Sequence, residues 1–273
     1  MFHYHTIYGI INLEKNSGGY TRRKGEIMPV QVNMRDGIAI LTLNDGIHNR
    51  FNRSFLDAFN ALLDKIESGE ETRALIITNE GNYFAEGMDV EWVMTLPGEE
   101  IELFMLDLFR FLHRMFLFPL PVIAAIKGHV VASGLAFALC PDYRIMRSDK
   151  DVCIFPEIDL RIEPPPGCLR MVVHAIGSRT TEMAFLQGNP YRGDDALKAG
   201  FVDETVPEGD VIERAISVAK GLAGKKTAIY AAIKRSLRSG PARDMLEEDA
   251  RFIKDSGMVE MLQNCDLDCL KSL

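Results

Sequence analysis

The chain has 273 residues, of which 47% are hydrophobic and 26% charged, a balance that excludes disordered and low-complexity proteins. Its 39 acidic and 31 basic residues give a formal net charge of −8, which disfavours nucleic-acid binding and leaves any anionic ligand to local cations. The five cysteines are odd in number and lack C-x-x-C spacing. We therefore expect no disulfide framework or structural zinc site, and a reducing compartment such as the cytoplasm.

Residues 1–27 differ in composition from the rest of the chain. They combine histidines, tyrosines and a Gly18-Gly19 pair, and they end in the basic run 22–24. A secretory signal places its basic residues before an apolar stretch, and here they come last. We therefore expect a flexible leader before a domain that begins near Met28, with organellar targeting as the alternative because Arg22 and Arg23 are present.

From Met28 onwards the sequence alternates strands with helices. Apolar residues at every second position from Val30, the turn Asp36-Gly37 and the apolar run 38–43 predict a β-hairpin. Short apolar runs predict further buried strands at 74–78, 122–126 and 143–146.

Helical spacing places helices between these strands. One helix is predicted over 55–66, capped by Ser54 and stopped by Gly69. A second carries apolar residues over 101–115 and must end before Pro119, and a short buried helix follows at 134–139. Prolines 119 and 121 and Lys127 interrupt the apolar stretch here, so no membrane span is expected. The alternation indicates an α/β fold.

After about Gly177 the pattern becomes all-helical. This shift predicts an α/β core over residues 28–207 and a C-terminal helical subdomain over 208–273, divided near Val206-Pro207. The predicted helices are 180–186, 194–199, 211–222, 227–237 and 241–256.

Common catalytic motifs are absent from the sequence. It contains no phosphate-binding P-loop, no dinucleotide-binding G-x-G-x-x-G after a strand and no metal-binding H-E-x-x-H. Val131 stands where a nucleophile elbow around Ser133 needs glycine, so a hydrolase serine is disfavoured.

Two turns rich in small residues lead from strands into helices, at 83–90 and 128–135. The first turn of a helix leaves backbone N–H groups without a partner. Two such groups brought together form an oxyanion hole that can stabilise the enolate of a thioester. Taken singly, each segment can equally be a tight turn.

Together these segments resemble the crotonase (enoyl-CoA hydratase/isomerase) superfamily. Its first signature, aromatic-x-x-Gly-x-Asp, matches residues 84–89. Its second, Gly-x-x-x-x-Gly-Gly-x-x-x-Ala followed by Asp, matches 128–138 and Asp142, with Ser133 where glycine is common. A third match runs from Gly193 to Asp203.

The resemblance implies a crotonase-like spiral of ββα units with a C-terminal α-helical subdomain that assembles a homotrimer or a dimer of trimers. It also implies an acyl-CoA substrate, with coenzyme A as part of the substrate and no further cofactor, in fatty acid metabolism. The backbone N–H groups of Met88 and Ser133 would form the oxyanion hole. The turn residues beside them, expected at the substrate, are Ala85, Gly87, Asp89 and Gly134.

The resemblance also points to a catalytic carboxylate. Family hydratases hold a water between two glutamates; the second matches Glu157, and the first is replaced by Ala136. One carboxylate suffices to move a proton between two carbons, which is the pattern of the family's Δ3,Δ2-enoyl-CoA isomerases. The stretch 45–55 also resembles the His-Arg-Leu-Asn-Pro segment of peroxisomal and plant-type isomerases, with Asn49 inserted.

Several alternatives stay open at this point. Glu86 and Glu163 are rival carboxylates. The reaction can be that of a hydratase, hydrolase or decarboxylase, or the protein can be a catalytically silent acyl-CoA-binding protein.

An acidic protein that binds coenzyme A needs local cations for the phosphates. Arg50 and Arg53 are candidates near the predicted entry strand. The helical tail offers Lys234, Arg235 and Lys254, from this or a neighbouring subunit. The acyl chain would lie against apolar residues such as Trp92 and Leu160, although both residue types are more often ordinary core.

Overall fold

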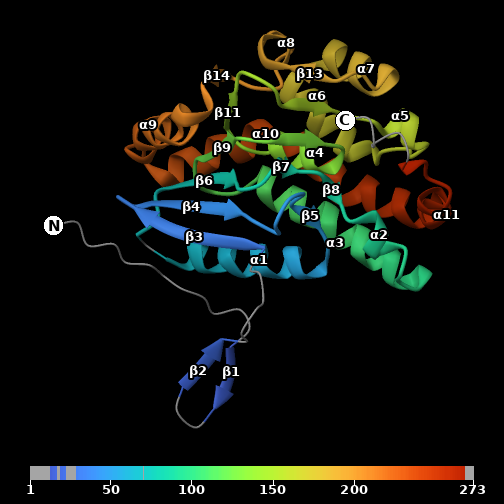
Figure 1. Cartoon of the computed structure of the whole chain (residues 1–273), viewed down its shortest axis with the longest axis horizontal. Coiled ribbons are helices and arrows are strands. Elements are labelled where there is room, and N and C mark those ends of the chain that lie inside the picture. The colour runs from blue at the N-terminus through green and yellow to red at the C-terminus, as the bar shows by residue number, and fades with distance from the viewer. Residues whose placement is uncertain (1–12, 17–18, 23–28, 70, 268–273) are drawn as a thin grey trace.

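The structure is a computed structural model that describes residues 13–16, 19–22, 29–69 and 71–267 (Figure 1). Strands β1 (Leu13–Asn16) and β2 (Gly19–Arg22) form an antiparallel hairpin. The rest of the predicted leader, residue 28 where the core was expected to begin, and Cys269 lie outside the described residues.

A six-stranded sheet forms the centre of the molecule, in the order β14-β11-β9-β6-β4-β3. The predicted hairpin is confirmed as the antiparallel pair β3 (Val30–Arg35) and β4 (Ile38–Leu43). All other neighbours in this sheet are parallel. The remaining strands are β6 (Ala74–Asn79), β9 (Val122–Ile126), β11 (Tyr143–Arg147) and β14 (Glu204–Val206).

A second, smaller sheet has the order β13-β12-β10-β7. Its three neighbours β7 (Tyr83–Ala85), β10 (His129–Val131) and β12 (Val152–Ile154) run parallel, and β13 (Tyr191–Arg192) adds an antiparallel edge. A separate parallel pair joins β5 (Arg50–Phe51) to β8 (Gly87–Met88). Each of these strands has only two or three residues.

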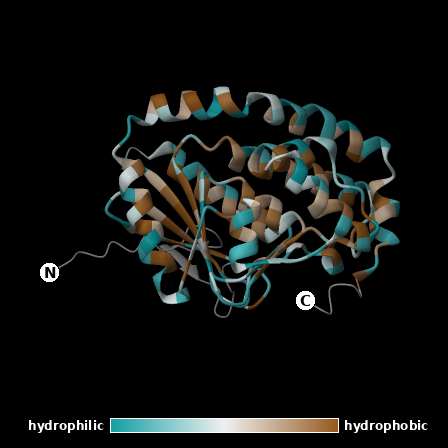
Figure 2. Ribbon diagram, turned by 90° about the horizontal axis from the view of Figure 1, so that it is seen from above, coloured by the Kyte–Doolittle hydropathy of each residue, from teal (hydrophilic) through white to brown (hydrophobic). Residues whose placement is uncertain are grey.

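Most helices pack around the sheets, whereas the short helix at residues 133–139 is almost entirely buried (Figure 1). In Figure 2 the strands of the large sheet are among the most hydrophobic parts of the molecule, and hydrophilic residues are spread over the helices. The helices are α1 (Arg53–Ser68), α2 (Val90–Val93), α3 (Gly98–Phe116), α4 (Ser133–Leu139), α5 (Glu157–Leu160), α6 (Pro166–Ile176), α7 (Ser178–Gln187), α8 (Gly193–Ala199), the 3₁₀ turn η1 (Glu208–Asp210), α9 (Val211–Ala223), α10 (Thr227–Asp255) and α11 (Met258–Gln263).

Two apolar clusters hold the layers together. The larger is built around phenylalanine rings, with Phe51, Phe59 and Phe111 packed edge-on against each other or against Phe137. The smaller lies between the large sheet and α9, where Ile76 and Ile123 meet Val211 and neighbouring alanines. Within the described residues, no helix is both long and apolar enough to cross a bilayer.

The start of α1 differs from the prediction. Asn52, and not Ser54, is its N-cap, and its side-chain oxygen accepts a hydrogen bond from the Phe55 N–H at 3.1 Å. Both residue types are good caps, and Asn52 holds the position because β5 ends at Phe51 and fixes where the chain turns. The predicted stop at Gly69 is confirmed.

The prediction that strands stop after Gly177 is wrong, since β13 and β14 both follow it. Strands of two or three residues are too short to show the alternation of apolar and polar residues. They are defined by pairing, β13 with β12 and β14 with β11. The predicted break before Pro241 is also wrong, because α10 runs through it. The proline removes one backbone hydrogen bond, while contacts on either side hold the helix in place.

The first of these contacts ties α10 to the segments that lead into β9 and β11. The buried Lys234 ammonium lies 2.6 Å from Asp142 Oδ2 and donates to the carbonyls of Phe118 and Leu120, both at 2.8 Å. Arg238 contacts Asp142 Oδ1 at 2.9 Å. Burial lowers the pKa of Lys234 to about 8, against the opposing effect of Asp142. These contacts show that the Asp of the second signature is structural.

The second contact is a helix cap supplied from a distance. Helix α6 begins after a run of prolines, and its N-cap residue Pro165 has no side chain that can accept a hydrogen bond. Asp249, from the C-terminal third of α10 and fully buried, accepts the Gly167 N–H at 2.5 Å instead. Burial raises the pKa of Asp249 to about 7, although the backbone amides of Gly167 and Cys168 favour the ionised form.

Replacing Asp249 with alanine should therefore lower the free energy of unfolding by about 2–3 kcal/mol, because a cap is lost and buried N–H groups are left without an acceptor. Asp249→Asn keeps one acceptor oxygen and should lose less. Urea denaturation followed by circular dichroism measures both. Glu247→Ala, at an exposed position on the same helix, is the control. Equal stability of Asp249→Ala and the wild type would show that the cap contributes nothing.

Candidate active site

The three residues predicted to act on substrate follow three neighbouring parallel strands. Met88 comes after β7, Ser133 after β10 and Glu157 after β12, each within three residues of the strand end. Pairing of Val130 with Ala85, and of Val131 with Ile154, fixes the strands in register. Because adjacent strands lie about 5 Å apart, their carboxyl ends bring the three predicted residues to one edge of the sheet.

The two predicted turns are in direct contact. A Cβ atom added to Gly134 would lie 2.2 Å from the Ala85 carbonyl oxygen, closer than any real contact. Gly87 has φ +106°, a conformation that side chains disfavour. Glycine is therefore required at 134 by the approach of the turns and at 87 by the backbone. Ala85, Gly87 and Gly134 shape the site and contribute no side-chain chemistry.

Both predicted N–H donors lie in this contact. Ser133 is the first residue of α4, so its N–H has no partner within the helix. The Met88 N–H donates to the Ser133 hydroxyl oxygen at 3.0 Å. Both residues are half-buried. The preceding Ala132 has φ 50° and ψ −127°, a conformation unusual for a residue with a side chain, and such strain clusters at functional sites.

Glu157 differs from the rival carboxylates in its surroundings. It is the first residue of α5, and its Oε2 atom is buried without a hydrogen-bond partner. Burial raises the pKa of Glu157 to about 8, although a backbone hydrogen bond favours the ionised form. Perturbed carboxyl groups of this kind are typical of catalytic acids and bases.

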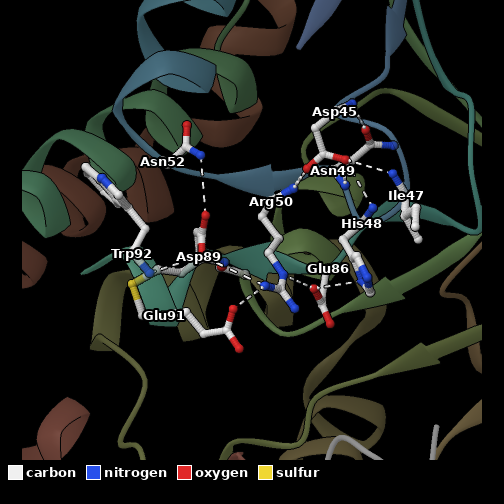
Figure 3. Close-up of polar contacts among 12 residues, drawn as sticks. Asp45, Ile47, His48, Asn49, Arg50, Asn52, Glu86, Asp89, Glu91 and Trp92 are labelled. Atoms are coloured by element: carbon white, nitrogen blue, oxygen red, sulfur yellow. Dashed lines mark hydrogen bonds and ion pairs between the residues drawn. The ribbon is translucent and has the colours of Figure 1, made fainter. Parts of the chain in front are cut away.

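The rival carboxylates have other surroundings. Glu163 is exposed. Glu86 is paired with the Arg50 Nε atom and lies 3.2 Å from His48 Nδ1 (Figure 3). Ala136, at the position of the first hydratase glutamate, is buried in α4. Of the three candidates, Glu157 alone combines burial with an unpartnered oxygen.

The loop before Arg50 explains how the chain accommodates the inserted Asn49. The Asp45 carboxylate accepts the N–H groups of His48, Asn49 and Arg50 at 2.7–3.1 Å. Asn49 adopts φ 51°, which asparagine tolerates well, and its side chain donates to the Tyr83 carbonyl at 2.7 Å. The insertion therefore anchors the loop to β7.

The predicted phosphate ligands are engaged with carboxylates. Arg50 contacts Glu91 at 3.2 Å and Asp89 at 3.9 Å in addition to Glu86 (Figure 3). Arg53 lies 2.9 Å from Asp107, and Lys234 is buried against Asp142. Lys234 is therefore not available to a phosphate at the surface.

The remaining predicted contacts lie around α2. Asp89 caps this helix, since its Oδ1 atom accepts the Trp92 N–H at 3.2 Å, and Asn52 donates to its other oxygen at 3.4 Å. The half-buried Trp92 ring meets Phe104 edge-on at 4.9 Å. Leu160 is buried at the end of α5. Asp89 therefore has a structural role that its place in the motif did not indicate.

Comparison with known proteins gives consistent results. Residues 33–265 match the family model described as "Enoyl-CoA hydratase/isomerase". The chain is 32% identical to enoyl-CoA delta isomerase 3 of Arabidopsis thaliana, over 74% of this chain and 89% of that protein. It is 28% identical to a probable enoyl-CoA hydratase of Bacillus subtilis, over 74% and 79% of the two chains.

Solved structures share the fold. Human mitochondrial delta3-delta2-enoyl-CoA isomerase superposes with a TM-score of 0.80 at 24% identity, over 89% of this chain and 98% of that chain. The expected crotonase-like fold, with a helical C-terminal region, is confirmed.

The buried Glu157 carboxyl makes stability depend on pH. Its pKa is about 8 in the folded protein against an ordinary value of 4.5. Between these values the unfolded chain releases a proton that the folded chain keeps, so this group should make the free energy of unfolding fall as pH rises through that window. Glu157→Gln lacks the effect.

Urea denaturation of the wild type and Glu157→Gln across the pH range should therefore show equal stability near pH 4 and a more stable variant at about pH 9. Glu163→Gln, at an exposed position, is the control and should follow the wild type. A constant difference between Glu157→Gln and the wild type at all pH values would contradict the raised pKa.

Proposed function

Because this chain belongs to the enoyl-CoA hydratase/isomerase family, we propose that it is a Δ3,Δ2-enoyl-CoA isomerase. The observation that carries the proposal is the buried, unpartnered carboxyl oxygen of Glu157 at the edge where the two turns meet, with alanine at 136, the position of the other hydratase glutamate. The substrate is an acyl-CoA thioester, and coenzyme A enters as part of the substrate and not as a separate cofactor.

The reaction moves one proton. The thioester oxygen accepts hydrogen bonds from the backbone N–H groups of Met88 and Ser133, which stabilise the enolate as negative charge develops on that oxygen. The ionised Glu157 carboxylate takes a proton from the carbon α to the carbonyl. The double bond shifts from the β,γ to the α,β position, and the same carboxyl returns the proton to the γ carbon.

The environment of Glu157 suits this role. A carboxyl group with a raised pKa is a stronger base than an exposed one, and its conjugate acid still releases the proton readily. Hydration needs a second group to activate or protonate water, and the Ala136 methyl group does neither. The arrangement supports isomerisation over hydration.

Around the reacting atoms, the turns that contain Ala85, Gly87 and Gly134 form the wall along the thioester, and Asp89 holds α2 in place. Trp92 and Leu160 lie against the acyl chain. Arg50 contacts a phosphate of coenzyme A when it exchanges its exposed partner Glu91 for that phosphate.

We also propose that the protein forms a homotrimer or a dimer of trimers through its C-terminal helices. Helix α10 exposes Ile229, Ile233 and Leu237 at 55–68% of their surfaces. These residues are spaced by four, so they form one apolar stripe along the helix. Exposed apolar stripes of this size mark interaction surfaces.

The isomerase activity is tested with purified protein and 3-enoyl-CoA thioesters of several chain lengths. We expect growth of the absorbance of the conjugated 2-enoyl thioester, and a fall in kcat of at least about 100-fold in Glu157→Gln, because the proton acceptor is lost. Glu163→Gln should retain full activity.

Product analysis separates the alternatives. A 3-hydroxyacyl product would identify a hydratase, and release of free coenzyme A or carbon dioxide would identify a hydrolase or a decarboxylase. Tight thioester binding without turnover would identify a silent binding protein. Full isomerase activity in Glu157→Gln would remove the proposed role of that residue.

The oligomer is tested by light scattering coupled to size-exclusion chromatography. Ile233→Glu places a charge in the middle of the apolar stripe and should convert a trimer or hexamer into smaller species. Arg235→Glu, on the same helix, is the matched control. A monomeric wild type at micromolar concentration would contradict the proposed assembly.

A further inference from the structure

The side chain of Ser133 lies in the position that the proposed function reserves for substrate. Its hydroxyl oxygen is 3.0 Å from the Met88 nitrogen and accepts that N–H. The Met88 N–H is one of the two donors assigned to the thioester oxygen. An N–H group has one proton. The thioester oxygen can therefore form a well-aligned hydrogen bond with the Met88 N–H only if the Ser133 hydroxyl gives up its own.

The fit around this hydroxyl is close. A Cβ atom added to Gly87 would lie 2.8 Å from Ser133 Oγ and 3.1 Å from the Gly134 nitrogen. The hydroxyl therefore packs against the Gly87 backbone, inside the contact between the two turns. Because Ser133 is half-buried, its side chain can reach another staggered rotamer.

We propose that Ser133 is a specificity-determining residue whose hydroxyl competes with the substrate carbonyl for the oxyanion hole. This inference rests on the proposed function. In the free protein the hydroxyl satisfies the Met88 N–H. When a thioester binds, its carbonyl oxygen displaces the hydroxyl, which rotates away, and no covalent bond changes.

A tethered hydroxyl differs from a water molecule in the same position. A displaced water enters bulk solvent and recovers its freedom of motion. The Ser133 hydroxyl stays attached and must find a new partner nearby. The serine therefore weakens the binding of ligands that need the hole and leaves ligands without a carbonyl oxygen unaffected.

The test compares two ligands that differ in this oxygen. Octanoyl-CoA carries the thioester carbonyl and has no double bond to move, and S-octyl-CoA is the matching thioether. Isothermal titration calorimetry gives the dissociation constant of each for the wild type, Ser133→Ala and Ser133→Gly. Both variants keep the backbone N–H of residue 133 and lose the hydroxyl.

We expect octanoyl-CoA to bind both variants about fivefold more tightly than the wild type, the value of one ordinary hydrogen bond, and S-octyl-CoA to bind all three equally. Ser178→Ala, the first residue of α7 and exposed, should change neither affinity. Unchanged or weaker octanoyl-CoA binding in both variants would overturn the inference, and weaker binding would indicate that the hydroxyl assists the thioester. An equal change for both ligands would overturn it too, because a structural effect does not depend on the carbonyl.

The outcomes also separate this inference from the proposed function. If octanoyl-CoA binds neither the wild type nor the variants, both are refuted. If 3-enoyl-CoA is isomerised and the ratio of the two affinities stays the same in Ser133→Ala, only the role of the serine is refuted.

Discussion

The contact between the turns after β7 and β10 is the constraint on which the rest of the structure depends. A Cβ atom on Gly128, the residue before β10, would lie 2.6 Å from the Asn82 carbonyl oxygen. A Cβ atom on Gly134, in the helix that follows β10, would lie 2.2 Å from the Ala85 carbonyl oxygen. The strand is thus pressed against its neighbour at both ends. Segments from distant parts of the sequence approach this closely only because neither glycine has a side chain.

The electrostatic arrangement around this contact divides the carboxylates into two kinds. The first kind has partners and a structural role. Glu86 is paired with Arg50, and Asp89 accepts hydrogen bonds from Asn52 and from the Trp92 N–H at the start of α2. Glu157 has a buried oxygen with no partner, which costs stability in any folded protein. A loss of stability of this kind is typical of a site that needs an unsatisfied group for its chemistry. The strained backbone of Ala132, next to Ser133, also lowers stability at the same place.

Much of this arrangement could be predicted from the sequence, and the rest could not for physical reasons. The hairpin and the strands of the large sheet are predictable because each is a run of apolar residues with a clear period. The strands of the small sheet are not, since pairing and not composition defines two or three residues. Spacing leaves Glu86, Glu157 and Glu163 equivalent, and only tertiary burial distinguishes them.

Asp249 caps a helix 82 residues earlier, which no local pattern indicates. The unusual serine at 133 was visible as a departure from glycine, but the hydrogen bond of its hydroxyl was not.

The ion pairs of Lys234 and Arg238 with Asp142 have a consequence for how the protein is made. A ribosome releases the α/β core first, and domains generally fold as the chain emerges. The core that emerges first has Asp142 without its cations and the carbonyls of Phe118 and Leu120 without their donor, until α10 leaves the exit tunnel. Helix α10 therefore completes the core, and a nascent chain stalled before residue 234 would present these unpaired groups to chaperones.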